Sequence, residues 1–421
     1  MEFASMVLNR TFIIFGILIL GVLLIGNVVA THHFLTEPYP GHNDFLSRWE
    51  GARAYWQDGL NPYSDAASLS IQERIYGRAV VEGEDPGFFA YPFYTVFFVG
   101  PLVTVSYAWA SAIWMVILEV SLIAALFLLM NLLNWKPHPW LLALMLVWTL
   151  LFYFSARGLI LGQPGHLVYF LQIFALWAFW KGRDDWAGAM LALSTFKPQM
   201  GFLLVPLILL WAFRVQRWRM ISSFVVVFGV LILGSFILQP SWMGDWLKQV
   251  QNYPSYTALG SPVWIVTEYY LGLGSAVTTL VTIVLYGALF WVWYDVLKKR
   301  DATRFLWTVA LTLTITHLVA VRTATPHYVV FMLPIIFYFR SLQNWRPRQA
   351  SLWTGGILLL LLILPWIHFL LTVEGEFEHP SVYLPLPFLS LILLWYTRRL
   401  WWRASPQFFL VEKTLLTGAA D

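Results

Sequence analysis

The chain alternates long apolar runs with short polar loops. The first run, from Thr11 to Ala30, has about the 20 residues that a helix needs to cross a hydrocarbon core. It is longer than a typical signal-peptide core and no convincing cleavage site follows, so we expect a retained anchor helix. Further helix-length apolar runs cover residues 107–133, 139–156, 163–180, 221–238, 275–296, 305–321, 326–339, 351–371 and 383–397.

The loops between these runs carry most of the Lys and Arg residues. Short cytoplasmic loops of membrane proteins are enriched in these residues, so we place all the basic loops on the cytoplasmic side. The basic clusters lie at residues 135–138, 181–183, 214–219, 298–304, 340–348 and 398–403.

Two segments do not fit a simple alternation. Residues 91–105 are apolar but short, and Pro92 and Pro101 interrupt them, so we expect a re-entrant or surface-lying segment. Residues 186–213 have basic loops at both ends, which predicts a hairpin of two short helices with Lys197 at its far tip. The resulting topology has about 12 crossings with both termini cytoplasmic.

This topology predicts a single integral-membrane domain over residues 1–421. Its largest extracytoplasmic loop is 31–91, a second is 239–274, and residues 398–421 form a cytoplasmic tail. We therefore expect an all-α polytopic protein of the plasma (inner) membrane. We expect the first outer loop to carry helices that lie on the membrane surface.

Composition excludes other classes of protein. The chain is 59% hydrophobic and 11% charged, with a mean hydropathy of +0.68, which a soluble domain could not accommodate. It has no cysteine, which excludes disulfides and thiolate metal sites. The net charge of +4 without a dense basic run argues against a nucleic-acid partner and fits the cytoplasmic loop bias.

The first outer loop begins with the stretch "HNDFLSRWEGARAYWQDGLNPY". Its apolar residues recur at steps of four, three and four, which predicts a helix ending near Gly59. Asp44 lies where this helix begins, either as an N-cap or as a functional carboxylate; Asn43 could also cap it. Arg48 and Arg53 are expected to extend to the membrane interface. The apolar face consists of Phe45, Trp49, Ala52 and Trp56.

Polar and ionisable residues from distant segments are predicted to face the same outer side. Taken singly, Arg157 fits a helix end and His327 a hydrogen-bonded core histidine. However, ionisable groups at membrane depth cost about 2.5–3.5 kcal/mol each, and their convergence indicates a functional chamber. The residues are Arg157, Gln163, His166, Lys197, Gln199, Arg322, Thr325, His327 and Tyr328.

One carboxylate and several cations suit a particular reaction. Glycosidases generally need two carboxyl groups, one of which protonates the leaving group. A prenyl phosphate leaves as a stable anion and needs only cations. Asp44 could then act as the general base, which predicts inverting sugar transfer from a lipid phosphate.

The same residues resemble glycosyltransferase family 87. The likeness covers roughly residues 10 to 345 and rests on "HNDF", "LILGQPGHLVYFL", "STFKPQM" and "TATPHYVVFMLP" in this order. Relatives usually have Tyr-Pro-Pro where this chain has Tyr91-Pro92-Phe93. The family's catalytic aspartate, glycine-glutamine, lysine-proline and proline-histidine motifs correspond to Asp44, Gly162-Gln163, Lys197-Pro198 and Pro326-His327.

The resemblance implies a GT-C fold and a polyprenyl-phosphate sugar donor, with mannose the first expectation and arabinose or glucose also compatible. It implies an extracytoplasmic active site, a lipid-linked or glycan acceptor, membrane-lipid surroundings, no cofactor and no metal. We interpret the acidic run Glu82-Glu84-Asp85 as a solvated loop. The alternatives are a lipid-linked sugar flippase or transporter, whose charges would line a path, and an oligosaccharide polymerase or ligase.

Overall fold

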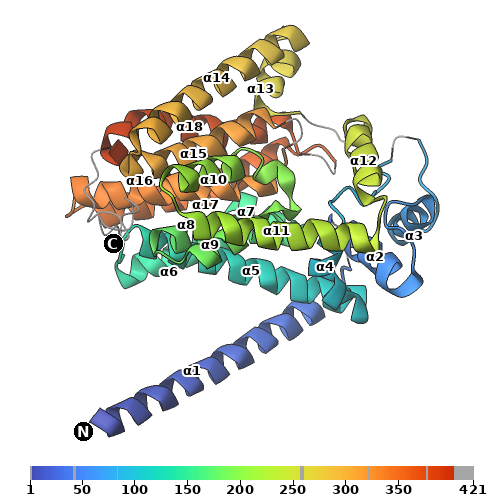
Figure 1. The fold of residues 1–421 in the computed structure, drawn as a ribbon, viewed down its shortest axis with the longest axis horizontal. Helices are drawn as coiled ribbons and strands as arrows, with labels where there is room; N and C mark the ends of the chain where they lie inside the picture. Colours follow the sequence, from blue (N-terminus) through green and yellow to red (C-terminus); the bar gives the residue numbers. More distant parts are fainter. Residues whose placement is uncertain are drawn as a thin grey trace.

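The computed structural model describes residues 2–40, 44–82, 84–256, 260–320, 323–375 and 378–402, and this part of the chain is helical. Long helices run side by side in one bundle, and α1 diverges from it (Figure 1). In the described part of the chain, seven helices are candidate membrane spans by length and hydropathy. They are α1 (Glu2–Thr31) with η1 (His32–Thr36), α5 (Tyr107–Leu132), α11 (Trp218–Leu238), α14 (Ser275–Lys299), α15 (Ala302–Val319), α17 (Ala350–Thr372) and α18 (Pro385–Trp402) with η7 (Pro380–Tyr383).

An eighth candidate is the bent pair α6 (Pro139–Leu151) and α7 (Tyr153–Ile160), whose axes differ by 49°. The expected count of about 12 crossings is not confirmed. The difference lies in four shorter helices, because at 1.5 Å per residue even the 16 residues of the longest one fall short of a full crossing. These are α8 (Gly165–Trp180), α9 (Asp184–Leu193), α10 (Leu204–Arg214) and α16 (Met332–Trp345).

Helices of the two large polar loops gather at one end of the bundle, where Figure 1 shows α2 (Asp44–Asp58), α3 (Asp65–Tyr76) and α12 (Trp242–Tyr256) together. Asn61 Nδ2 donates to Asp245 Oδ2 of the second loop over 2.9 Å, and the Tyr55 hydroxyl donates to the carbonyl of Leu238, the last residue of α11 before that loop, over 3.1 Å. The loops that the sequence assigns to one side of the membrane therefore lie together. The second loop continues through α13 (Pro262–Trp264) and η5 (Ile265–Tyr270).

Helix α2 packs on the segment that follows the first loop rather than lying alone on a surface. That segment forms α4 (Thr95–Val99) and η2 (Gly100–Thr104), which are too short to span a membrane. Trp49 Nε1 donates to the Leu102 carbonyl over 2.9 Å, and Gln57 Nε2 to the Val103 carbonyl over 2.7 Å. The predicted apolar face is confirmed at Phe45, Trp49 and Ala52, which are buried, whereas Trp56 is 47% exposed.

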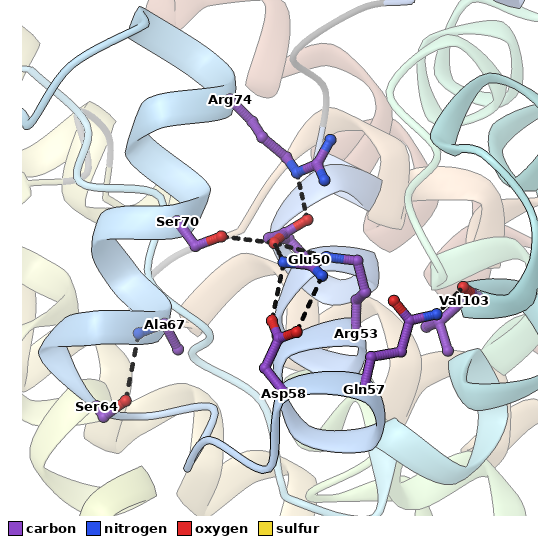
Figure 2. Close-up of polar contacts among 9 residues, drawn as sticks. All are labelled: Glu50, Arg53, Gln57, Asp58, Ser64, Ala67, Ser70, Arg74 and Val103. Atoms are coloured by element: carbon purple, nitrogen blue, oxygen red, sulfur yellow. Dashed lines mark hydrogen bonds and ion pairs between the residues drawn. The ribbon is translucent and has the colours of Figure 1, made fainter.

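A buried carboxylate connects α2 to α3. Glu50 is fully buried and pairs with Arg53 at 2.6 Å and with Arg74, while Ser70 donates to it over 2.6 Å (Figure 2). Arg53 also contacts Asp58 at 3.0 Å, so this arginine has an internal ion-pair role instead of the expected interfacial one. A buried charge left unpaired would be strongly destabilising, so these partners fix how α3 sits on α2.

The α9–α10 segment forms the predicted hairpin. The Arg217 guanidinium, just beyond α10, donates to Asp184 at the start of α9 from Nε over 2.9 Å, so the chain returns to the side it came from. At the tip, η3 (Ser194–Phe196) and η4 (Pro198–Met200) flank Lys197. Residues before proline avoid the helical region, and Lys197 has φ −124° and ψ 81°. Pro198 therefore sets the break that places Lys197 at the tip.

Candidate active site

Gly162 sets the position of the polar side chain that follows it. Its φ is +62°, a conformation that favours glycine, and a Cβ there would lie 2.6 Å from the Phe45 Cβ. Trp114 Nε1 donates to the Gly162 carbonyl over 2.8 Å and holds the turn. The glycine thus lets the start of α2 approach the turn between α7 and α8, which brings Gln163 beside Asp44.

Gln163 bridges an acid and a base. Its Nε2 donates to the Asp44 carboxylate, and its Oε1 accepts from the Lys197 ammonium. The amide uses its donor toward the anion and its acceptor toward the cation, so both charges favour the same amide orientation. Asp44 is exposed, whereas Gln163 and Lys197 are 7% and 1% exposed. The accessible carboxylate is thus linked through one amide to a buried ammonium.

Arg48 supports the backbone of Asp44. Sequence reasoning placed it at the membrane interface, which is wrong, because its side chain is 1% exposed. It donates to the Asp44 carbonyl and to the Tyr91 hydroxyl, and its Cζ lies 4.0 Å from the centroid of the Tyr91 ring. The Tyr63 hydroxyl in turn donates to the Tyr91 carbonyl over 2.6 Å. The loop end at which the chain departs from Tyr-Pro-Pro is thus tied to the start of α2.

The segment η6 (Thr325–Phe331) reaches the same region. A Cβ on Gly165 would lie 3.2 Å from Met200 Sδ and 3.6 Å from His327 Cδ2. The segment η6 therefore approaches the tip of the α9–α10 hairpin next to the turn between α7 and α8. His327 Nδ1 accepts from the Ala324 N–H over 3.2 Å, which leaves its proton on Nε2. Within the described residues that Nε2 is buried and has no hydrogen-bond partner.

His317 was missed by sequence reasoning. Its ring centroid lies 6.1 Å from that of His327, and neither ring nitrogen has a hydrogen-bond partner in the described part of the chain. The sequence feature that could have identified it is a histidine near the end of the run 305–321, which has no other ionisable residue. His166 has a more structural setting: its Nε2 is 2.8 Å from the Ser155 carbonyl, and a Cβ on Gly158 would lie 2.0 Å from its Cε1.

Arg157 belongs to a second polar cluster, centred on Glu378. Its Nε lies 3.0 Å from Glu378 Oε1, and its guanidinium lies over the Phe369 ring at 5.5 Å. Glu378 also accepts from the Thr325 hydroxyl over 2.8 Å and from the hydroxyls of Tyr153 and Tyr383. The cluster joins α7, η6 and η7, so it holds the chain two residues before His327.

Asp85 is a second carboxyl group within electrostatic range of Asp44. Asp85 is exposed overall, but local desolvation and the negative charge of Asp44 raise its pKa, against the effect of a hydrogen bond from the Gly87 N–H. Its neighbour Glu84 instead pairs with Arg78 at 2.7 Å. Glu82 and Asp85 are exposed, as expected for a solvated loop, and Glu84 is partly covered beside Arg78.

The direct contacts thus join Asp44, Gln163 and Lys197, with His327 nearby and Arg157 in the adjoining cluster. Arg322 and Asn43 lie outside the described residues. Among the residues that the structure describes, no group of three or more His, Asp or Glu side chains is arranged to hold a metal ion.

A model of glycosyltransferase family 87 matches residues 89–320, more than half of the 421 residues, and the chain belongs to this family. Family membership indicates a glycosyltransferase, and the candidate spans indicate a membrane protein. The matched region contains Gln163 and Lys197, whereas Asp44 and His327 lie outside it. No curated protein and no solved structure is significantly similar to the chain.

Proposed function

We propose that the protein transfers one sugar, mannose in the first instance, from a polyprenyl phosphate to a lipid-linked or glycan acceptor. The observation that carries this proposal is the bridge from the exposed Asp44 carboxylate through Gln163 to the buried Lys197 ammonium. Here one acid and one buried cation contact the same amide. This arrangement suits a reaction in which an alcohol attacks and a phosphate leaves. The reaction needs no metal and no other cofactor in this proposal.

In the proposed step, Asp44 takes the proton of an acceptor hydroxyl as its oxygen attacks the anomeric carbon. The new bond joins that oxygen to the anomeric carbon, and the bond to the phosphate oxygen breaks on the opposite face, with inversion. The electron pair leaves with the polyprenyl phosphate. Lys197, His327 and Arg322 stabilise the charge that develops there, and Gln163 keeps the acid and the ammonium apart.

The remaining residues have supporting roles in this proposal. Arg157 and His166 shape the walls around the sugar and phosphate rather than contacting the attacking oxygen. The protein adopts a GT-C arrangement in the plasma membrane, in which the four short helices complete a set of about 12 membrane-embedded segments. Both termini are cytoplasmic, and Asp44 faces outward with α2, α3 and α12.

The test is an Asp44→Asn variant assayed with polyprenyl-phosphate sugars in detergent or vesicles. We expect a loss of transfer of about 100-fold or more while binding of polyprenyl phosphate survives. Asp58→Asn is the matched control, because Asp58 lies on the same helix and pairs with Arg53. Full activity of Asp44→Asn would refute the assignment. A variant that transfers sugar at the wild-type rate once a divalent ion is added would also refute it.

The same assay separates the alternatives. A flippase would move labelled lipid across reconstituted vesicles without a covalent product. A polymerase or ligase would add more than one sugar per turnover, which mass spectrometry of the product measures directly.

A further inference from the structure

A polar pocket of about 290 Å³ lies at the turn between α8 and α9, outside the candidate active site. Helix α8 starts beside Gln163 and has 16 residues, so at 1.5 Å per residue the turn lies about 24 Å away along the helix axis. The pocket is formed by this turn, the first residues of α9 and the start of α11. Its lining residues are Gly182, Arg183, Asp184, Asp185, Trp186 and Arg219.

The turn holds Arg183 in a defined place. Gly182 has a φ of +70°, which favours glycine, and the Arg183 N–H donates to the Ala178 carbonyl over 2.8 Å, as in a Schellman helix end. The Arg183 guanidinium lies over the Trp177 ring, 5.5 Å from its centroid, and Trp177 Nε1 donates to Asn131 Oδ1 of α5 over 2.8 Å. The stacked arginine is thus positioned by the protein itself, which lowers the entropy that a ligand contact would otherwise cost.

The charges around the pocket leave a positive excess. Asp184 accepts from Arg217 Nε over 2.9 Å, and the two side chains are only 13% and 10% exposed. Asp185 pairs with Arg219 at 2.6 Å, and both of these side chains are largely exposed. Among the described residues no carboxylate pairs with Arg183. Both acids are therefore neutralised and the charge of Arg183 is not, so the complementary ligand is an anion.

Two tryptophans place the pocket at the level of the lipid headgroups. Trp186 on α9 and Trp218 at the start of α11 are 55% and 53% exposed. The two helices are in contact at this end, since a Cβ on Gly188 would lie 2.2 Å from the Met220 carbonyl oxygen. Exposed tryptophans at the ends of membrane helices lie in the interface, and α11 is a candidate span. The pocket that Trp186 lines therefore lies at the depth of lipid phosphates.

We propose that this pocket binds the phosphate group of an anionic phospholipid, in the leaflet opposite Asp44. Arg183 contacts a phosphate oxygen, and Trp186 packs against the glycerol backbone. Arg219 shares its remaining N–H donors with the phosphate, because its exposed ion pair with Asp185 contributes little. A soluble phosphate offers the same anion, but a lipid also matches the interfacial depth of the pocket.

The bound lipid connects the α8–α9 turn to α11. The α9–α10 hairpin, whose tip carries Lys197, begins at this turn. A ligand that binds only the folded state stabilises it, so anionic lipid should stabilise the base of the hairpin. This role does not depend on the proposed sugar transfer.

The first test titrates the full-length protein in detergent with phosphatidylglycerol, phosphatidylcholine or inorganic phosphate. Native mass spectrometry counts the bound lipid, and thermal unfolding is followed in the same samples. We expect phosphatidylglycerol to bind more tightly than phosphatidylcholine and to raise the melting temperature more. Arg183→Gln should weaken phosphatidylglycerol binding about 5-fold.

Arg398→Gln is the matched control, because Arg398 also lies over a tryptophan, 4.1 Å from the Trp395 ring centroid, and is outside the pocket. It should leave the affinity for phosphatidylglycerol unchanged. Equal weakening in the two variants would overturn the proposal, since it would show only a response to total charge. An equal rise in melting temperature with inorganic phosphate would overturn the assignment to a lipid.

The second test changes binding in the opposite direction. Asp185→Asn removes the acid that competes with the lipid for Arg219, and should tighten phosphatidylglycerol binding about 5-fold. Asp295→Asn is its control, because it removes the same charge from an ion pair with Lys299 outside the pocket. Unchanged affinity in Asp185→Asn, or equal tightening in both variants, would contradict the proposal. Neither test needs sugar transfer, so both remain decisive if the proposed function fails.

Discussion

The amide of Gln163 donates a hydrogen bond to the carboxylate of Asp44, although the two residues are 119 positions apart in the sequence. The same amide accepts from Lys197, 34 positions away. The amide nitrogen of one side chain thus contacts an anion, and its amide oxygen contacts a cation. One neutral side chain therefore links the proposed base to the proposed phosphate-binding cation.

Replacing Gln163 with alanine tests this dependence. The exposed Asp44 carboxylate would lose a donor that water can replace, whereas the buried Lys197 ammonium would lose its acceptor, which costs about 1–3 kcal/mol when left unmade. We expect kcat for sugar transfer to fall about 10- to 100-fold, with a smaller change in acceptor KM. Steady-state kinetics with a labelled prenyl-phosphate sugar measures both.

The control is Gln57→Ala, which removes an amide from α2 that donates to the Val103 carbonyl over 2.7 Å, away from the charged bridge. It should leave kcat per folded molecule close to that of the wild type. Equal losses in the two variants would show that Gln163 contributes only to folding.

The buried Glu50 is expected to contribute to stability rather than to catalysis. A Glu50→Gln change leaves Arg53 and Arg74 facing a neutral amide and should lower the free energy of unfolding by about 1–3 kcal/mol. Glu73→Gln on the exposed side of α3 is the control, with an expected effect within about 0.5 kcal/mol. Thermal unfolding in detergent compares them; a Glu50→Gln protein as stable as the control would contradict the inferred connection between α2 and α3.

The sequence could predict local features and only part of the non-local ones. The apolar face of α2 follows from helical periodicity, and the hairpin break follows from Lys197-Pro198, since both depend on neighbouring residues. The burial of Arg48 was not predictable, because its partner Tyr91 is 43 positions away and a lone arginine on an amphipathic helix ordinarily reaches water. The partner of Arg157, Glu378, is 221 positions away and was hidden in a small acidic loop.

The crossing count shows a second limit. Hydropathy identifies apolar segments, but it does not say whether a helix of 10 residues such as α9 or 16 such as α8 ends inside the membrane. In this chain those short helices are the ones that bring polar residues to the site. The segments that are hardest to count from the sequence are therefore those that carry Gln163 and Lys197.

Asp85 gives a pH-dependent prediction. Its pKa is raised in the folded protein, so the folded state binds its proton more tightly than the unfolded chain does. Stability should then decline as pH rises from the ordinary Asp value of about 3.9 through the raised folded value, and remain lower above it. Asp85→Asn removes this penalty and keeps an oxygen for the Gly87 N–H.

We therefore expect the Asp85→Asn protein to be more stable than the wild type at neutral pH, with the difference vanishing as the pH approaches the ordinary Asp value. Thermal unfolding of both proteins across this pH range makes the comparison. A constant difference at every pH would mean that Asp85 does not titrate beside Asp44.

Glu378 is expected to act on the site by positioning the chain that leads to His327. Its carboxylate accepts from Arg157, Tyr153, Thr325 and Tyr383, and a Glu378→Gln change would offer an amide donor to partners that are themselves donors. We expect a lower melting temperature together with a fall in kcat of about 10-fold, from roughly 1.4 kcal/mol of lost positioning. Glu374→Gln, at an exposed position four residues earlier, should change neither.

Thr325→Val separates positioning from stability, because it removes the link to η6 and leaves the ion pair of Glu378 with Arg157 intact. We expect this variant to retain most of the stability lost in Glu378→Gln while showing a similar fall in kcat. Measuring kcat per folded molecule and the melting temperature for both variants distinguishes the two effects. If Thr325→Val has wild-type kcat and Glu378→Gln loses only stability, the cluster anchors α7 to the segment around η7 and does not position His327.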